Sequence, residues 1–132
     1  MDRTLMIVKP DAVAKNVIGD IVRMVEEQGF KVLQIQMIHQ TREQAGEFYE
    51  VHKERPFYND LVDFMTSGPC VPMVLEKDDA VPSLREVIGA TNPAEAAEGT
   101  IRHAHGGDIQ NNAVHGSDSP ANAEIEIAHY FG

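Results

Sequence analysis

The sequence predicts an α+β sandwich, because a strand–helix–strand order occurs twice along its 132 residues. Four short segments have the apolar or alternating pattern of strands, and apolar residues recur at helical spacing between them. Two such units make the split βαβ arrangement, in which four strands form a mostly antiparallel sheet. We therefore expect a ferredoxin-like fold with helices packed on one face of the sheet, in a single domain spanning residues 1–132.

The first strand–helix–strand unit occupies residues 4–38. Residues 4–8 (TLMIV) are a short apolar run, which is typical of a buried strand. The helix is predicted over residues 17–28, with Val17, Ile18, Ile21, Val22 and Val25 on one side and Gly29 just after its end. Residues 32–38 alternate, with Leu33, Ile35 and Met37 set against Gln34 and Gln36, which predicts a strand with one apolar face.

A pair of helices should precede the third strand. Thr41 and Gln44 have the spacing of a capping box. The helix that follows places its larger side chains on one face, namely Ala45, Phe48, Tyr49 and His52. Arg55-Pro56 interrupts it, and a second short helix runs through Leu61, Val62 and Met65. Residues 70–76 then form a strand in which Cys70 is expected to be buried.

The second unit completes the sheet. Asp79 begins a helix that Gly89 ends, and the polar, Gly-rich residues 99–111 predict a loop. Residues 113–115 form a short fourth strand. Ser119-Pro120 begins a final helix that ends near Phe131.

The acidic composition restricts the partners that the chain can bind. The net charge of −10 opposes binding to nucleic acid, because a phosphate backbone would be repelled. No apolar segment is long enough to cross a bilayer, and the N-terminal segment lacks the apolar core of a signal peptide. Together with the single Cys70, these observations predict a cytoplasmic protein.

Phosphate binding would depend here on side chains and a metal, because the sequence has neither Gly-rich phosphate-binding motif. The candidate cations are Lys9, Arg55, Arg85 and Arg102, which lie at the ends of elements or in loops. His115 is the last residue of a predicted strand and begins the turn HGSDS. A histidine at such a place is a nucleophile, a general base, a metal ligand or a structural residue. Ser117 and Glu126 are close enough in sequence to orient its ring.

The sequence resembles the nucleoside diphosphate kinase family over nearly its whole length. Six segments carry the resemblance: IVKPDAV (7–13), FYEVHKERPFYNDLV (48–62), MTSGP (65–69), GATNPAEA (89–96), GTIR (99–102) and NAVHGSDS (112–119). The resemblance implies an enzyme that moves the γ-phosphate of a nucleoside triphosphate to a nucleoside diphosphate by a ping-pong mechanism. It also implies a homo-oligomer, and Mg²⁺ held mainly by the substrate phosphates without a defined set of protein ligands.

The resemblance assigns expected roles to individual residues. His115 would be the phosphorylated nucleophile, with Ser117 and Glu126 orienting it and Tyr49 nearby. Lys9 would contact the phosphates and the sugar, and Asn112 would bind the sugar. The phosphates would lie against Arg85, Thr91 and Arg102. Phe57 would stack on the base, with Leu61 as further apolar lining. The family usually has an acidic and an aromatic residue where this chain has Ala104 and His105.

Two other functions compete with this one. A zinc enzyme could use His103, His105, Asp108 and His115, since histidines and a carboxylate are common zinc ligands. A non-catalytic nucleotide-binding module of the same fold could act as a regulatory sensor, because a fold does not fix a function. The remaining histidines, His39, His52 and His129, are expected to be structural.

Overall fold

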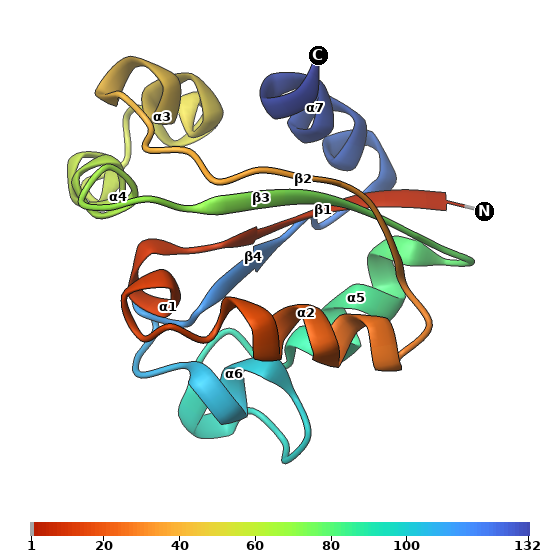
Figure 1. Ribbon diagram of the computed structural model, residues 1–132. Helices are drawn as coiled ribbons and strands as arrows, with labels where there is room; N and C mark the ends of the chain where they lie inside the picture. Colours follow the sequence, from red (N-terminus) through yellow and green to blue (C-terminus); the bar gives the residue numbers. More distant parts are fainter. Residues whose placement is uncertain (1) are drawn as a thin grey trace.

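The computed structural model describes residues 2–132, which form one four-stranded sheet between two layers of helices (Figure 1). The strands are β1 (Asp2–Val8), β2 (Lys31–Ile35), β3 (Val71–Lys77) and β4 (Val114–Gly116), in the order β2-β3-β1-β4. Each neighbouring pair is antiparallel. The helices are α1 (Pro10–Ala14), α2 (Ile18–Glu27), α3 (Arg42–Phe48), α4 (Tyr58–Met65), α5 (Ala80–Ile88), α6 (Ile101–His105) and α7 (Pro120–Phe131), with 3₁₀ turns η1 (Glu50–His52) and η2 (Pro93–Glu95). The predicted ferredoxin-like fold is confirmed.

Helices cover both faces of the sheet, so the expectation that they lie on one face is wrong (Figure 1). On one face, Met6 and Val8 of β1 pack in a core with α2 and α5. On the other face, Leu5 and Ile7 pack with α3, α4 and α7. The run TLMIV already contains the reason, because consecutive apolar residues are typical of a strand that is buried on both sides.

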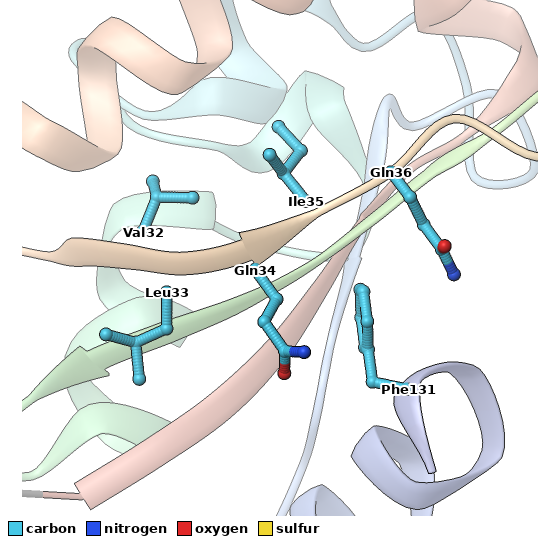
Figure 2. A pocket seen from close by; sticks show the side chains of 6 residues that line it. All are labelled: Val32, Leu33, Gln34, Ile35, Gln36 and Phe131. Carbon is cyan, nitrogen blue, oxygen red and sulfur yellow. The ribbon is translucent and has the colours of Figure 1, made fainter.

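Strand β2 is shorter and less regular than the predicted strand over 32–38. Its pairing with β3 shifts register between Val32 and Gln34, as at a β-bulge. Figure 2 shows Leu33 and Gln34 pointing to one side of the strand, and Val32 and Ile35 pointing to the other. The predicted single apolar face is therefore wrong, and Leu33, Ile35 and Met37 remain 37%, 48% and 57% exposed.

Two short helices lie where the sequence indicated none. The first, α1, begins with Pro10, whose fixed φ suits the first helical position. The second, α6, lies in the segment that was expected to be a loop. The Thr100 side chain accepts a hydrogen bond from the His103 backbone N–H, and Ile101 is fully buried. The cap, together with the buried residues Ile101 and Arg102, is enough to form this short helix.

Other local predictions are confirmed. Thr41 and Gln44 form the reciprocal hydrogen bonds of a capping box at the start of α3. Gly89 ends α5 with a φ of 93°, and the Ser119 side chain caps α7. Cys70 is buried, and burial raises the pKa of its thiol to about 11. Among residues 2–132, no helix is both long and apolar enough to span a bilayer.

Candidate active site

Strand β4 fixes the position of His115. The backbone pairs His115 with Ile7 of the central strand β1. Just before β4, Ala113 has a left-handed φ of 73°, which is unfavourable for a residue with a Cβ. Its N–H donates to the Asp11 carboxylate at 3.0 Å, and its carbonyl accepts from the Lys9 N–H at 2.8 Å. These two bonds hold the strained turn, so the backbone that carries His115 is rigidly placed.

The His115 ring is tethered through one of its two nitrogens. Nε2 lies 2.9 Å from Oε1 of Glu126, and the Ser117 hydroxyl donates to the same oxygen at 2.7 Å. Because a carboxylate only accepts hydrogen bonds, Nε2 carries the proton in the neutral ring and Nδ1 carries the lone pair. Within residues 2–132 Nδ1 has no hydrogen-bond partner, and the side chain is 28% exposed. The partly exposed ring therefore keeps an unprotonated Nδ1 without a protein partner.

His115 lines a hollow of about 400 Å³ with several of the expected site residues. Tyr49, Arg85, Thr91, Arg102 and Glu126 share this lining. Tyr49 is buried, which raises the pKa of its hydroxyl, so it is a neutral group near His115. Arg85 is exposed, and one of its N–H groups lies 3.4 Å from the Gly116 carbonyl. The hollow thus combines the His115 ring with two cations, Arg85 and Arg102.

The guanidinium group of Arg102 is largely engaged by the backbone. Arg102 as a residue is 9% exposed, and its guanidinium group donates to the carbonyls of Asn112, Gly89 and Val114 at 3.3, 3.2 and 2.9 Å. Burial, and secondarily the charge of Arg85, lower its pKa to about 10. It therefore remains a cation at neutral pH while it also holds the segment on which His115 lies.

Lys9 and Asn112 form a buried hydrogen-bonded chain beside the hollow. Lys9 Nζ donates to the Asn112 carboxamide oxygen at 2.7 Å and to the Gln110 carbonyl at 2.9 Å. Asn112 in turn donates to the Thr91 carbonyl at 3.0 Å. Burial lowers the pKa of Lys9 to about 8, against a smaller opposing effect of Asp11. The charge of Lys9 is therefore sensitive to pH in the range where enzymes are assayed.

Phe57 and Leu61 line a second hollow of about 270 Å³, not the one that contains His115. Asp60, Ile109 and Gln110 complete its lining. Phe57 is 46% and Ile109 is 62% exposed, so both have apolar surface available for a flat ligand. The chain Gln110–Lys9–Asn112–Thr91 connects this hollow to the hollow of His115. The Phe57 hollow, the hydrogen-bonded chain and the His115 hollow therefore follow one another in the same order as the base, sugar and phosphates of a nucleotide.

Sequence reasoning missed several residues of the first hollow: Phe48, His52, Asp118, Asn122 and Ile125. The Phe48 ring lies edge-on to His115, with centroids 5.5 Å apart. His52 was expected to be structural, but it lines the hollow and its ring centroid lies 5.4 Å from that of Phe57. The signal for Asp118 was its place in the turn HGSDS, and the signal for Ile109 in the second hollow was an isolated apolar residue in a polar loop.

The four residues of the zinc hypothesis do not converge. His103 Nδ1 contacts the Ala96 carbonyl, and His105 Nε2 contacts the Asp20 carboxylate at 2.5 Å. Asp108 accepts from Gln110 and Asn111, and His115 is paired with Glu126. Over residues 2–132 no group of three His, Cys, Asp or Glu side chains could hold a metal ion. Arg55 is also outside the lining of the His115 hollow.

A ferredoxin-like sandwich that places a carboxylate-tethered histidine beside two arginines fits a phosphotransferase that acts on nucleotides. A family model described as nucleoside diphosphate kinase matches residues 2–132. The chain belongs to the nucleoside diphosphate kinase family.

Individual relatives agree with this assignment. The nucleoside diphosphate kinase of Chlorobium chlorochromatii is 57% identical over 131 residues, which cover 99% of this chain and 94% of the relative. That of Salinibacter ruber is 52% identical, with 98% and 92% covered. The solved structure of the Aquifex aeolicus nucleoside diphosphate kinase gives a TM-score of 0.95 at 49% identity, covering 99% and 95%. A halophilic nucleoside diphosphate kinase from Halobacterium salinarum, in complex with CDP, gives 0.94 at 42% identity, covering 98% and 87%.

Proposed function

We propose that this enzyme transfers the γ-phosphoryl group of a nucleoside triphosphate to a nucleoside diphosphate through a phosphohistidine at Nδ1 of His115. The observation that carries the proposal is the 2.9 Å contact between Nε2 and Glu126, which leaves the lone pair on Nδ1. In the first half-reaction this lone pair attacks the γ-phosphorus while the bond to the bridging β-phosphate oxygen breaks, and the diphosphate departs with that oxygen. In the second half-reaction an oxygen of another diphosphate attacks the phosphohistidine, which restores the neutral ring.

Glu126 stabilises the intermediate state of the ring. When Nδ1 bonds to phosphorus, the imidazole becomes positively charged and Nε2 keeps its proton. The carboxylate at 2.9 Å offsets this charge, and Ser117 fixes the carboxylate by donating to the same oxygen. A regulatory module that only binds nucleotides has no need of this arrangement, so the non-catalytic alternative is not favoured.

The remaining site residues bind and neutralise the substrate. Arg85, Arg102 and Thr91 would hold the phosphates, since phosphoryl transfer depends mainly on positioning and charge stabilisation. Lys9 and Asn112 would meet the sugar and the adjoining phosphates, between the two hollows. The base would stack on Phe57 against Leu61 and Ile109.

Mg²⁺ is the expected cofactor. Mg²⁺ in nucleotide sites is typically held by substrate phosphates, waters and one or two carboxylates. Asp118 fits this pattern, because it is an exposed carboxylate in the lining of the His115 hollow and Asn122 and Arg85 help to lower its pKa. Bound Mg²⁺ would neutralise phosphate charge. The protein residues described above would orient the nucleotide around it.

Initial-rate kinetics test the proposed function. Varying the triphosphate at several fixed diphosphate concentrations should give parallel double-reciprocal lines, because the first product leaves before the second substrate reacts. Intersecting lines would mean direct transfer between two bound nucleotides, and the covalent mechanism would then be wrong.

The exposed edge of β2 suggests how the expected homo-oligomer forms. This edge strand presents Leu33, Ile35 and Met37, and the run 32–38 carries no charge although the chain has a net charge of −10. Two copies can therefore meet here, edge to edge and antiparallel, without like-charge repulsion.

We also propose that residues 1–132 act as a single catalytic domain and that the chain is cytoplasmic, as its lone buried thiol suggests.

A further inference from the structure

Two polar side chains complete the lining of the otherwise apolar base hollow. Phe57, Leu61 and Ile109 provide its apolar surface, whereas Asp60 and Gln110 bring a carboxylate and a carboxamide. Stacking on an aromatic ring accepts any base, because every base has a π-face. Hydrogen-bonding groups beside the stack can distinguish bases, because their edges differ in donors and acceptors.

Both polar side chains are carried by backbone that is held in place. The Gln110 carbonyl accepts from Lys9 Nζ at 2.9 Å, and its N–H donates to the Asp108 carboxylate at 3.0 Å. Asp60 lies in the first turn of α4, next to Leu61. The fold therefore sets where their backbone lies relative to the stacking surface.

Neither side chain has another role in the part of the chain that the structure describes. Within residues 2–132, the Asp60 carboxylate and the Gln110 carboxamide make no hydrogen bond or ion pair with protein groups. Carboxylates close to them in sequence do have partners, such as Asp63 with Arg42 and Asp108 with Asn111. The two polar groups at the base hollow are thus free to bind a ligand.

We propose that Asp60 and Gln110 contact the hydrogen-bonding edge of the base and make this enzyme prefer guanine nucleotides. This inference rests on the proposed function, since it places the base in the hollow of Phe57. Guanine has two adjacent donors, N1–H and the 2-amino group, beside the acceptor O6. A carboxylate accepts from both donors, and a carboxamide N–H donates to O6.

The other bases match this pair of groups less well. Adenine and cytosine each place a ring nitrogen lone pair next to their amino group, which a carboxylate repels. Uracil and thymine have a single donor between two acceptors. Because Asp60 and Gln110 are exposed, water competes for the same bonds, so the preference is modest, about fivefold for the 2-amino contact.

Equilibrium binding of paired nucleotides tests the proposal without depending on turnover. Isothermal titration calorimetry with Mg²⁺ would compare guanosine diphosphate with inosine diphosphate, which lacks only the 2-amino group. The wild-type protein should bind the guanosine compound about fivefold more tightly. Asp60→Asn should reduce this ratio to below about twofold, because an amide pairs poorly with two donors. Gln110→Ala should weaken both compounds equally, since both contain O6.

A charge-matched control separates recognition from general electrostatics. Asp78→Asn removes one exposed negative charge outside the base hollow, and it should leave the ratio at the wild-type value. Equal binding of the two nucleotides by the wild-type protein would overturn the proposal, as would a ratio that survives Asp60→Asn. Failure of the proposed function would be a different result: tight nucleotide binding with the expected ratio but no phosphorylated His115.

Discussion

Nε2 of His115 and Oε1 of Glu126 are joined by a contact of 2.9 Å, and Ser117 donates to the same oxygen. This relationship fixes which ring nitrogen carries the proton in the neutral ring, and hence which one would attack phosphorus in the proposed mechanism. It connects the three-residue edge strand β4 to α7, the last helix of the chain. The chemistry of the site therefore depends on how β4 and α7 pack together.

Removing the tether should slow the formation of the phosphoenzyme. For Glu126→Ala we expect the rate of His115 phosphorylation to fall by about 10- to 100-fold, by analogy with metal-binding histidines that lose their orienting carboxylate. Rapid-quench measurements would give this rate. Glu124→Ala, on the same helix but exposed, should retain the parent rate.

The identity of the phosphorylated ring nitrogen is a second test of the contact between His115 and Glu126. Nuclear magnetic resonance of the ¹⁵N-labelled phosphoprotein should place phosphorus on Nδ1 in the parent enzyme. A product modified at Nε2 would contradict the hydrogen-bond assignment.

The activity should fall as the pH rises through about 8. Lys9 has a pKa of about 8 in the folded protein, below its ordinary value of 10.5, because burial disfavours its charged form. Below this pKa it is a cation and attracts phosphate, whereas above it the charge is lost. This fall in activity near pH 8 should be seen as a step in the pH profile of kcat/KM, which reports pKa values of the free enzyme.

An arginine at this position would remain charged over the assay range. Lys9→Arg should therefore lack the step near pH 8, whatever its absolute rate. Lys31→Arg, an exposed change elsewhere, should keep the step. An unchanged step in Lys9→Arg would assign the titration to a different group.

The two arginines of the His115 hollow should differ in their effect on stability. Arg102→Ala removes three hydrogen bonds to backbone carbonyls, and we expect the free energy of unfolding to fall by about 2–4 kcal/mol. Arg85→Ala should change it by less than about 0.5 kcal/mol, since Arg85 is exposed. Both should slow transfer. Urea denaturation would measure the difference, and equal stabilities would show that the Arg102 hydrogen bonds contribute little.

A charge placed on the β2 edge should break the oligomer. Ile35→Glu puts a carboxylate into the uncharged run 32–38, so two copies of this edge would repel each other. Light scattering should show a lower solution mass than for the parent chain. Ile125→Glu changes a more exposed isoleucine on α7 and should keep the parent mass. If Ile35→Glu retains the parent mass, the interface lies elsewhere.

The sequence predicted the sheet well where side-chain patterns report directly on burial. The run TLMIV and the capping box of Thr41 depend on neighbours only a few residues away. The bulge at β2 could not be predicted in this way, because it comes from how Val32 and Gln34 pair with a distant strand. The alternation of Leu33 and Ile35 therefore suggested a face that the structure does not have.

The candidate site likewise has features that the sequence predicted and features that it did not. Motifs identified His115, Ser117, Lys9 and Arg102 because each lies within a short characteristic segment. They did not indicate that Lys9 would bond the Gln110 carbonyl, or that Arg102 would be held by three carbonyls. These contacts join residues that are far apart in sequence or depend on the path of a loop, so only the folded chain reveals them.

Transfer of labelled phosphate from a γ-³²P nucleoside triphosphate to the protein tests the central claim most directly. The parent enzyme should take up close to one phosphate per chain in an acid-labile, base-stable form, and a nucleoside diphosphate should remove it. His115→Asn should take up none, whereas His129→Asn should behave as the parent. Labelling that persists in His115→Asn, or label that no diphosphate can accept, would contradict a phosphohistidine intermediate at His115.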